Sequence, residues 1–578
     1  MLYQAAEFEL AILAREDGSG HKVCGRGVRR KGSASLCAMG YKVLMSRQMP
    51  FQVLRLRNNL SWNADSKLVW RCFLCNIDAL KKRHKQKNRN HCTASTIDFS
   101  HRGDNSMKLK KIVGVLAAIG IAAPGVAMAT NGMLMEGYGP IATGMGGASM
   151  AYDNGAAGMA NNPATIGMTT ASSSRLDIAI GGLHPDIDTK SAAGTAHSNG
   201  DAYYMPAAGW VKKDGALAYG VGVFAQGGMG TEYGTSSWLS AGTGLENRSE
   251  VGVGNMIVPL SYDVNPDLTI AGSLDFVWAS MDLKMLMSGT QLMDMMPTAY
   301  NPAATNSGGT VSGSMIDGFA SMMGGAPGQI SALNYGYFDF SNSNDFSGKA
   351  HSTGWAGKLG FTYKVNKQLT VGGTYHSKTS LGDMEGSASV AFNVDINGMG
   401  TATIPVDGKI SVRDFQFPET YGLGLSYQAN DKLMIAADYK RIGWADVMKN
   451  FKMSFAASGN TGMAAMFNGT VMDATMYQNW EDQDVFQLGV AYKATDALTL
   501  RAGANIANNP VPDAYVNPLF PATIKNHYTL GAGYAFNKVS DVNFSYVYAP
   551  KVTSTSPSGF VVDHAQTNNW QLMYSHRF

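Results

Sequence analysis

Residues 527–548 read HYTLGAGYAFNKVSDVNFSYVY, and this stretch indicates the fold class. Apolar and aromatic side chains recur at every second position on both sides of a polar turn at 537–540: Tyr528, Leu530, Ala532, Tyr534 and Phe536 before it, and Val542, Phe544, Tyr546 and Tyr548 after it. A period of two predicts β-strands, and the short Asn-Lys-Val-Ser turn predicts that the two strands form an antiparallel hairpin.

The same hairpin signal recurs along the chain. Tight turns rich in Asp, Asn, Gly and Lys join alternating runs at 213–216, 263–267, 365–368, 429–432, 493–496 and 537–540. With one strand before the first hairpin (about 174–184) and one after the last (about 567–578), the turns predict about fourteen strands. An apolar, aromatic-ended face opposite a small or polar face suits lipid outside and a lumen inside. The sequence therefore predicts an all-β fold, a transmembrane antiparallel β-barrel over 174–578.

Composition agrees with a barrel rather than a helical membrane protein. The chain of 578 residues has 67 Gly, 34 Met and only 15% charged residues, and its longest apolar runs fall short of the ~20 residues that a membrane helix needs. In a barrel alternate residues face lipid, so the mean hydropathy stays moderate, at -0.11.

The chain divides sharply at Met107. Residues 1–106 carry 19 Lys and Arg against 8 Asp and Glu, whereas 130–578 carry 24 against 35. All five cysteines lie in the first part: Cys24, Cys37, Cys72, Cys75 and Cys92. Residues 107–129 have the form of a signal peptide: a basic start, an apolar run over 112–123, and an A-x-A site that predicts cleavage between Ala129 and Thr130. Translation is expected to begin at Met107, which makes 1–106 a mis-annotated or disordered leader.

The leader contains two patterns with other interpretations. Cys72 and Cys75, followed by His84, His91 and Cys92, resemble a zinc knuckle, and the basic run at 81–89 resembles a nucleic-acid patch. The Cys-to-His spacing is short for a zinc finger, and the segment lacks a periodic apolar pattern. We expect neither a metal nor a nucleic-acid partner.

Residues 130–173 are Gly-rich and do not alternate, which predicts a compact irregular segment before the first strand. Three stretches of the mature chain resemble the FadL/TodX (OmpP1/FadL) family of outer-membrane transporters for long-chain fatty acids and other hydrophobic compounds. The first stretch is GYGP at 137–140, with the Gly cluster at 144–147 and NNPA at 161–164. The second is 497–504, with 508–513 and 521–522. The third is 527–534, with the aromatic end at Phe578. The resemblance covers 130–578. It implies a fourteen-stranded barrel whose lumen is closed by an N-terminal hatch over 130–173.

The resemblance also suggests functional residues, each with a plainer alternative. Hatch or gating residues would be Gly144, Gly146, Gly147, Asn162, Pro163 and Ala164, although a purely structural turn is equally compatible. The Met- and Gly-rich extracellular loop at about 285–348 would capture apolar cargo through residues such as Leu286 and Phe319, or would only pack against itself. A fatty-acid carboxylate would need an inward cation, and alternation offers Lys358, Lys440 and Arg501; these can instead form ion pairs with carboxylates such as Asp438.

The expected function is transport of hydrophobic compounds across the outer membrane, with long-chain fatty acids as the cargo. Uptake of aromatic hydrocarbons by the same fold, or a general diffusion porin, are the alternatives. No G-x-S-x-G element or His/Asp/Glu cluster indicates an enzyme, and no cofactor is expected. Expected partners are outer-membrane lipid and lipopolysaccharide, and the barrel-assembly machinery, which would read the terminal Phe578; the protein is expected to be a monomer.

Overall fold

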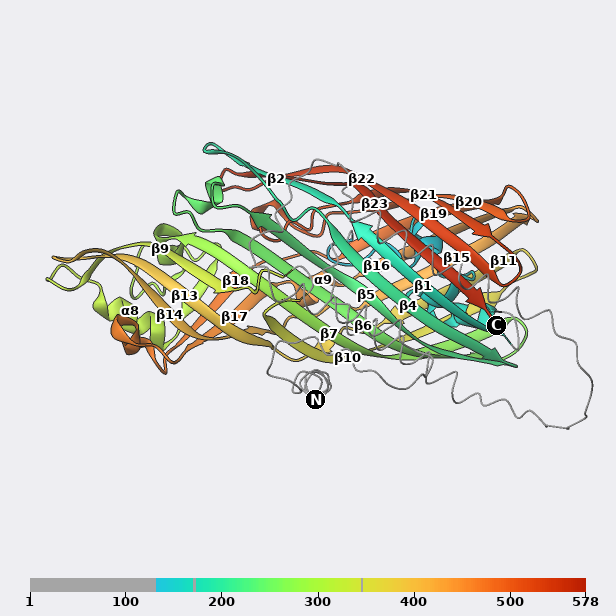
Figure 1. The fold of residues 1–578 in the computed structure, drawn as a ribbon, viewed down its shortest axis with the longest axis horizontal. Helices are drawn as coiled ribbons and strands as arrows, with labels where there is room; N and C mark the ends of the chain where they lie inside the picture. Colours follow the sequence, from blue (N-terminus) through green and yellow to red (C-terminus); the bar gives the residue numbers. More distant parts are fainter. Residues whose placement is uncertain (1–130, 170–172, 345–346) are drawn as a thin grey trace, which may run out of the picture. The chain divides into compact units, whose positions relative to one another are not determined.

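The computed structural model describes residues 131–169, 173–344 and 347–578 (Figure 1). The predicted leader (1–106), the signal peptide (107–129) and its cleavage point between Ala129 and Thr130 lie outside the described residues. Within the described residues, no helix combines the length and apolar composition needed to cross a membrane.

The wall of the molecule is one closed, antiparallel ring of strands. Each strand pairs with the next in the following order, and the last pairs with the first: β1 (Ser174–Leu183), β4 (Tyr203–Asp214), β5 (Leu217–Tyr233), β6 (Asn247–Asp263), β7 (Leu268–Ser288), β10 (Ala350–Lys364), β11 (Leu369–His376), β15 (Thr420–Asn430), β16 (Leu433–Ile442), β19 (Gln483–Lys493), β20 (Leu498–Ala507), β21 (Asn526–Ala535), β22 (Ser540–Thr555) and β23 (Val561–Arg577). The all-β, closed antiparallel barrel predicted from the alternation is confirmed.

The sheet continues beyond this ring, so that within the described residues it has 23 strands, where the sequence predicted about fourteen. The additional strands are β2 (Pro185–Ser191), β3 (Gly194–His197), β8 (Gly309–Ser312), β9 (Ile330–Phe340), β12 (Ser380–Leu381), β13 (Met384–Ile396), β14 (Gly400–Arg413), β17 (Asn450–Ala457) and β18 (Val471–Tyr477). The prediction counted only strands next to tight turns, and it was too low for the whole sheet because the intervening segments also pair with one another. Strands β9, β13, β14, β17 and β18 form the end of the molecule on the left in Figure 1.

Short helices fill the connections between the strands. On the loop side they are η3 (Trp238–Ser240), α7 (Gly289–Met295), α8 (Ser314–Met322), α9 (Trp444–Val447), η4 (Gly462–Phe467) and η5 (Asp513–Tyr515). The loop predicted at 285–348 therefore contains α7, α8, β8 and β9.

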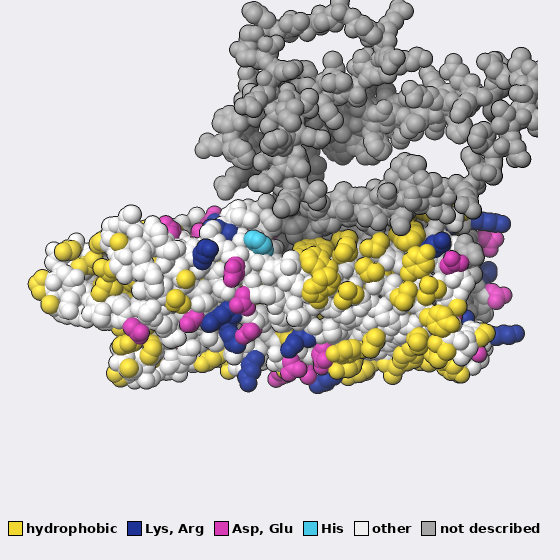
Figure 2. Space-filling model, turned by 90° about the horizontal axis from the view of Figure 1, so that it is seen from below, with side chains coloured by type: hydrophobic (Ala, Val, Ile, Leu, Met, Phe, Trp, Pro, Cys, Tyr) yellow, Lys and Arg dark blue, Asp and Glu magenta, His cyan; other side chains and the backbone are white. Residues whose placement is uncertain are grey.

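The outer face of the ring carries a band of exposed apolar side chains. On β15, Tyr421, Leu423, Leu425 and Tyr427 point outward with 50, 59, 38 and 40% of their surface exposed. Large apolar side chains exposed at this level in a row, with an aromatic residue at each end, are typical of a strand that faces lipid. On the face shown in Figure 2, these side chains gather over the half of the barrel that ends in the tight turns, and charged side chains lie beyond them on both sides.

Candidate functional site

Residues 131–168, here called the N-terminal segment, form a compact chain of short turns before β1. It contains α5 (Pro140–Thr143), η1 (Gly155–Ala157), α6 (Gly158–Asn161) and η2 (Pro163–Met168). Pro140 and Pro163 each stand in the first turn of a helix, where a missing N–H costs nothing. Asn162 caps η2, because its side chain accepts the N–H of Ala164.

Hydrogen bonds from many wall strands hold the N-terminal segment inside the ring. On β16, one oxygen of Asp438 accepts the N–H groups of Ser149 (2.6 Å) and Met150 (3.1 Å), and on β15 the Ser426 hydroxyl donates to the carbonyl of Ala151 (2.7 Å). Others come from Asp177 of β1, Gln226 of β5, Phe361 of β10, His376 of β11, Gln487 of β19, Thr529 of β21 and Gln571 of β23. Since these strands are distributed around the ring, the segment occupies the lumen.

The predicted glycines lie where the segment approaches the wall most closely. Gly146 and Gly147 have φ of 71° and 86°, a conformation that side chains disfavour. A Cβ at Gly146 would lie 2.6 Å from the carbonyl oxygen of Ala504. Gly144 has ordinary helical φ, but a Cβ there would lie 3.1 Å from Cα of Gly531 on β21. All three positions therefore require a small residue.

The predicted Asn-Pro-Ala turn ties the segment to β10. The Asn162 side-chain amide donates to the carbonyls of Met150 (2.7 Å) and Phe361 (3.0 Å). Pro163 and Ala164 are buried beside it. The turn packs against Gly360 of β10, where a Cβ would collide with the Asn162 side chain.

The ring has a window in its hydrogen bonding between β4 and β5. These strands pair with each other only between the turn and the pair of Ala208 with Val223. Beyond that point, among the wall strands, Tyr203–Ala207 of β4 pair only with β1, and β5 pairs only with β6. Above the window, the N–H of Asn199 donates to the carbonyl of Glu232 (2.7 Å). Two features interrupt the pairing: Pro206 has no N–H to donate, and β5 has a bulge between Ala225 and Gly227.

A cavity of about 50 Å³ lies behind the window, between the wall and the N-terminal segment. Its lining is mainly small and apolar and comes from β1, β4, β5, β23 and the segment; it includes Met135, Tyr138, Ala156, Met205, Phe224 and Ala225. The segment also contacts the bulge directly. Leu134 bridges to Gly227, and the Tyr138 hydroxyl donates to the carbonyl of Gln226 (3.0 Å).

Two smaller cavities lie on the other sides of the same stretch of the segment. One, of about 30 Å³, is lined by Lys440, His376, Thr420, Gln226 and Asn131, and the fully buried Asn131 amide has no hydrogen-bond partner among the described residues. The other, of about 10 Å³, is apolar and lies toward the loops; it is lined by Met133, Val251, Met281, Phe415, Met448, Phe451, Gln478 and Phe520.

The three predicted cations have different surroundings. Lys358 forms a buried ion pair with Asp275, and Arg501 donates to the side-chain carbonyl of Asn543 (3.0 Å). Lys440 donates to the backbone carbonyl of Glu136 (3.3 Å) and lines the 30 Å³ cavity. Of the three, Lys440 is therefore the cation that borders a cavity beside the segment.

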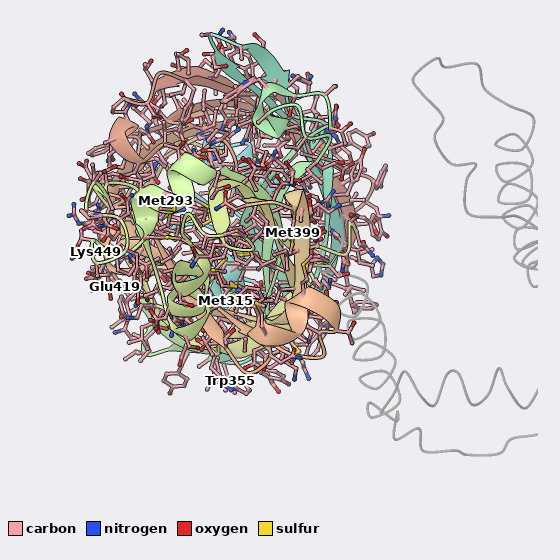
Figure 3. The ribbon with its side chains drawn as sticks, turned by 90° about the vertical axis from the view of Figure 1, so that its left-hand side faces the viewer. Met293, Met315, Trp355, Met399, Glu419 and Lys449 are labelled. Carbon is pink, nitrogen blue, oxygen red and sulfur yellow. The ribbon has the colours of Figure 1, made fainter. Side chains whose placement is uncertain are left out.

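The predicted loop residues belong to an apolar interior that the loops enclose. Phe319 of α8 is 1% exposed, and its ring lies 5.2 Å from that of Phe392, whereas Leu286 of β7 is half-buried. In the end-on view of Figure 3, Met293 and Met315 lie within the outline of the barrel and Trp355 lies at its edge.

Sequence reasoning missed an aromatic cluster above the N-terminal segment. The Trp444 ring lies 6.1 Å from that of Phe417 and 5.2 Å from that of Trp480, and all three are buried. Trp444 also covers Gly132, where a Cβ would meet its ring at 2.6 Å. These aromatics lie in connections or short helices, where no alternation identifies an inward position.

A model of the family described as outer membrane protein transport protein (OMPP1/FadL/TodX) matches residues 117–573. The chain belongs to this family. Among solved structures, the toluene transporter TodX of Pseudomonas putida is 30% identical, with a TM-score of 0.65, 77% of this chain covered and 99% of TodX. The toluene transporter TbuX of Ralstonia pickettii is also 30% identical, with a TM-score of 0.60 and coverage of 77 and 99%.

Two curated outer-membrane proteins match over shorter stretches. Outer membrane protein P1 of Haemophilus influenzae is 27% identical over 196 residues, which are 34% of this chain and 37% of P1. The 47 kDa outer membrane protein of Pasteurella multocida is 24% identical over 39% of this chain and 50% of that protein. The chain thus spans at most half the length of the curated relatives it matches. Family membership and the closed barrel together place the protein in the outer membrane.

Proposed function

We propose that the protein transports hydrophobic molecules across the outer membrane and releases them sideways, through the window between β4 and β5, into the lipid. The observation that carries this proposal is the window itself, because it opens on an apolar cavity and is bordered on the outer face by the exposed side chains of Ile180 and Tyr204. A solute gains ~0.8 kcal/mol for each CH₂ that leaves water, so a route from protein interior to lipid avoids the cost of returning it to water. The fourteen strands of the ring would cross the membrane.

In this proposal the N-terminal segment is the hatch. The cavities around it measure about 50, 30 and 10 Å³, whereas an apolar cavity that holds benzene measures ~150 Å³. Cargo that enters any of these three cavities therefore requires the segment to move. Gly144, Gly146, Gly147 and the turn at Asn162, Pro163 and Ala164 would set its closed position, since they fix its closest approaches to the wall.

Monoaromatic hydrocarbons are the cargo that we propose first. The relatives that match at 29–30% identity over 99–100% of their length are described as toluene transporters or monoaromatic hydrocarbon channels. The interior above the segment is lined by aromatic rings, including Phe417, Trp444 and Trp480, which suit a flat apolar ligand.

Long-chain fatty acids, the cargo expected from the sequence, are the second candidate. The specific observation in their favour is the 30 Å³ cavity, where the Lys440 ammonium and the unpartnered Asn131 amide could receive a carboxylate. Lys358 serves this role less well, because Asp275 already neutralises it.

The window can be tested by deleting Gln226, the residue inserted at the bulge. Removing the extra residue should straighten β5 and allow it to extend its pairing with β4. Cells that lack other transporters of this kind would express the protein or the deletion variant, and initial uptake of labelled toluene and labelled oleate would be measured. We expect uptake by the variant to fall at least tenfold while the barrel still folds.

A truncation of the side chain, Gln226→Ala, is the control for toluene uptake, since it keeps the bulge and the backbone carbonyl that Tyr138 contacts; for oleate it also alters the lining of the 30 Å³ cavity. Unchanged uptake by a folded deletion variant would exclude lateral release through this window. Large ion-conducting steps in planar bilayers would instead indicate a general diffusion porin.

A further inference from the structure

The hairpin of β2 and β3 rises from the loop side of the barrel wall and carries an outward-facing set of polar side chains. One face of β2 is buried, with Ile187 at 1% and Thr189 at 0% exposure. Alternation places Asp186 and Asp188 on the opposite, outward face. His197 of β3 lies directly opposite Asp188 in the strand register, so the pairing holds the two side chains on the same face.

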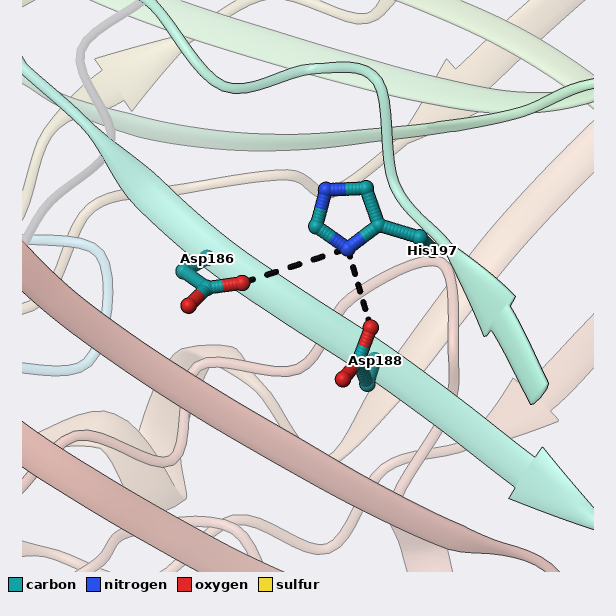
Figure 4. A group of neighbouring side chains, drawn as sticks. All are labelled: Asp186, Asp188 and His197. Carbon is teal, nitrogen blue, oxygen red and sulfur yellow. Dashed lines mark hydrogen bonds and ion pairs between the residues drawn. The ribbon is translucent and has the colours of Figure 1, made fainter.

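Three potential ligand atoms converge on this face (Figure 4). His197 Nδ1 lies 2.9 Å from Asp188 Oδ1 and 3.9 Å from Asp186 Oδ1, and all three atoms lie within 4.8 Å of one another. Zinc binds imidazole nitrogen and carboxylate oxygen at ~2.0–2.2 Å, which separates neighbouring ligand atoms by roughly 3–3.5 Å. Small side-chain rotations are enough to bring the three atoms to that spacing.

The charges around the set favour a cation. The adjacent lysines are engaged elsewhere, because Lys190 and Lys551 both contact Asp563, at 2.6 and 3.2 Å. In the ion pairs of the described residues, Asp186 and Asp188 occur only with His197, so two carboxylates face one imidazole. The three side chains are 62, 36 and 54% exposed, which leaves an ion free access from the medium and room for water ligands.

We propose that Asp186, Asp188 and His197 bind a divalent first-row transition-metal ion, with Zn²⁺ as the probe, and that the ion clamps the β2–β3 hairpin. An imidazole combined with carboxylates suits zinc and its neighbours, whereas Ca²⁺ and Mg²⁺ prefer oxygen ligands alone. The ion would replace the contact between His197 and Asp188 with three bonds, two to the carboxylates of β2 and one to the imidazole of β3.

The test is titration of Zn²⁺ into the protein purified in detergent from the outer membrane, which is expected to begin at Thr130 and so to lack the five cysteines, without an affinity tag and after treatment with a chelator. Calorimetry is expected to show one Zn²⁺ per chain, and Co²⁺ to give visible d–d absorption at the same site. The variants His197→Ala and Asp188→Asn are each expected to weaken binding at least tenfold. His184→Ala is the matched control and should bind as the unaltered protein does, because His184 contacts the carbonyl of Asp201 instead.

Circular dichroism identifies variants that fail to fold. If His197→Ala does not fold, Asp188→Asn serves as the test, because it keeps the shape of the side chain. Binding that is equally strong in folded His197→Ala and Asp188→Asn would place the ion elsewhere and overturn the proposal. The absence of stoichiometric Zn²⁺ binding by the unaltered protein would also overturn it, and would leave an ordinary ion pair between His197 and Asp188.

Discussion

Replacement of Asn162 by Ala should release the N-terminal segment from β10 without disturbing the barrel. The side chain makes three hydrogen bonds: to the carbonyls of Met150 (2.7 Å) and Phe361 (3.0 Å), and from the N–H of Ala164 (3.1 Å). Loss of a helix cap costs about 1 kcal/mol, and each of the other two bonds contributes about 1 kcal/mol net. The bonds to Met150 and Ala164 lie within the segment, so the sum of about 3 kcal/mol applies to local unfolding of residues 150–168, a change of roughly a hundredfold, whereas release from β10 breaks only the bond to Phe361, a change of roughly fivefold.

Amide hydrogen exchange, followed by mass spectrometry on the purified protein in detergent, measures this equilibrium directly. In Asn162→Ala, the slowly exchanging amides of residues 150–168 should exchange up to about a hundredfold faster, while those of β19 to β23 should be unchanged. Asn366→Ala is the matched control: it removes an asparagine whose side chain caps an exposed turn between β10 and β11, remote from the segment. If exchange in 150–168 rises less than threefold in a folded Asn162→Ala protein, Asn162 does not hold the segment closed.

Three further predictions concern the glycine cluster, the cargo and the loops. Gly146→Ala should displace the segment and lower the melting temperature of the protein, because the new Cβ would meet the Ala504 backbone at 2.6 Å with φ at 71°; Gly215→Ala, which also has positive φ but open space, isolates the conformational part of the effect. Lys440→Met should reduce oleate uptake at least tenfold if fatty acids are carried, and should leave toluene uptake unchanged. If the variant takes up oleate as fast as the unaltered protein does, Lys440 does not bind cargo. Hydrogen bonds from the Thr305 backbone and side chain lower the pKa of Asp294, so their contribution to loop stability is present above the ordinary carboxyl pKa of ~4 and is lost as the pH falls through the lowered value. The protection factor of the Thr305 amide, which corrects its exchange rate for the pH dependence of intrinsic exchange, should therefore fall only in strong acid, and a fall near neutral pH would contradict this account.

Local pattern was sufficient to locate the strands next to tight turns. Each of the six predicted turns joins two strands of the ring, because a period of two and a polar turn are both contained within about twenty residues. The strands inside 285–348 were missed for the opposite reason. Strand β8 pairs with β18 and β9 with β13, so their partners lie far away in sequence and no turn marks them.

The site was predictable in its composition but not in its contacts. The glycine cluster and the Asn-Pro-Ala turn stand out in the sequence, and alternation correctly places Asp438 facing inward. That this carboxylate would receive the N–H groups of Ser149 and Met150 depends on how two distant segments meet, which no local pattern contains. The window is harder to predict than these contacts, because it is a place where two neighbouring strands lack hydrogen bonds to each other. In the sequence, Pro206 is its only local signal.

The N-terminal segment and the window share the same few residues of β5, so their movements should be coupled. The bulge at Gln226 ends the continuous pairing of β5, and the segment is attached at this point through Tyr138 to Gln226 and through Met133, whose carbonyl accepts the N–H of Gly228 (3.0 Å). Movement of the segment must therefore break contacts that hold the edge of the window. Tyr138→Phe removes one hydrogen bond of about 1 kcal/mol and keeps the ring, so both segment and window should open roughly fivefold more often.

A double-mutant cycle separates coupling from coincidence. If one equilibrium controls both features, Tyr138→Phe should accelerate amide exchange in the segment and in 227–229 by the same factor, and deletion of Gln226 should abolish the effect at both places. Acceleration in the segment alone would mean that the segment moves independently of the wall. In that case the window would be a fixed feature, and the movement of the segment alone would control the passage of cargo.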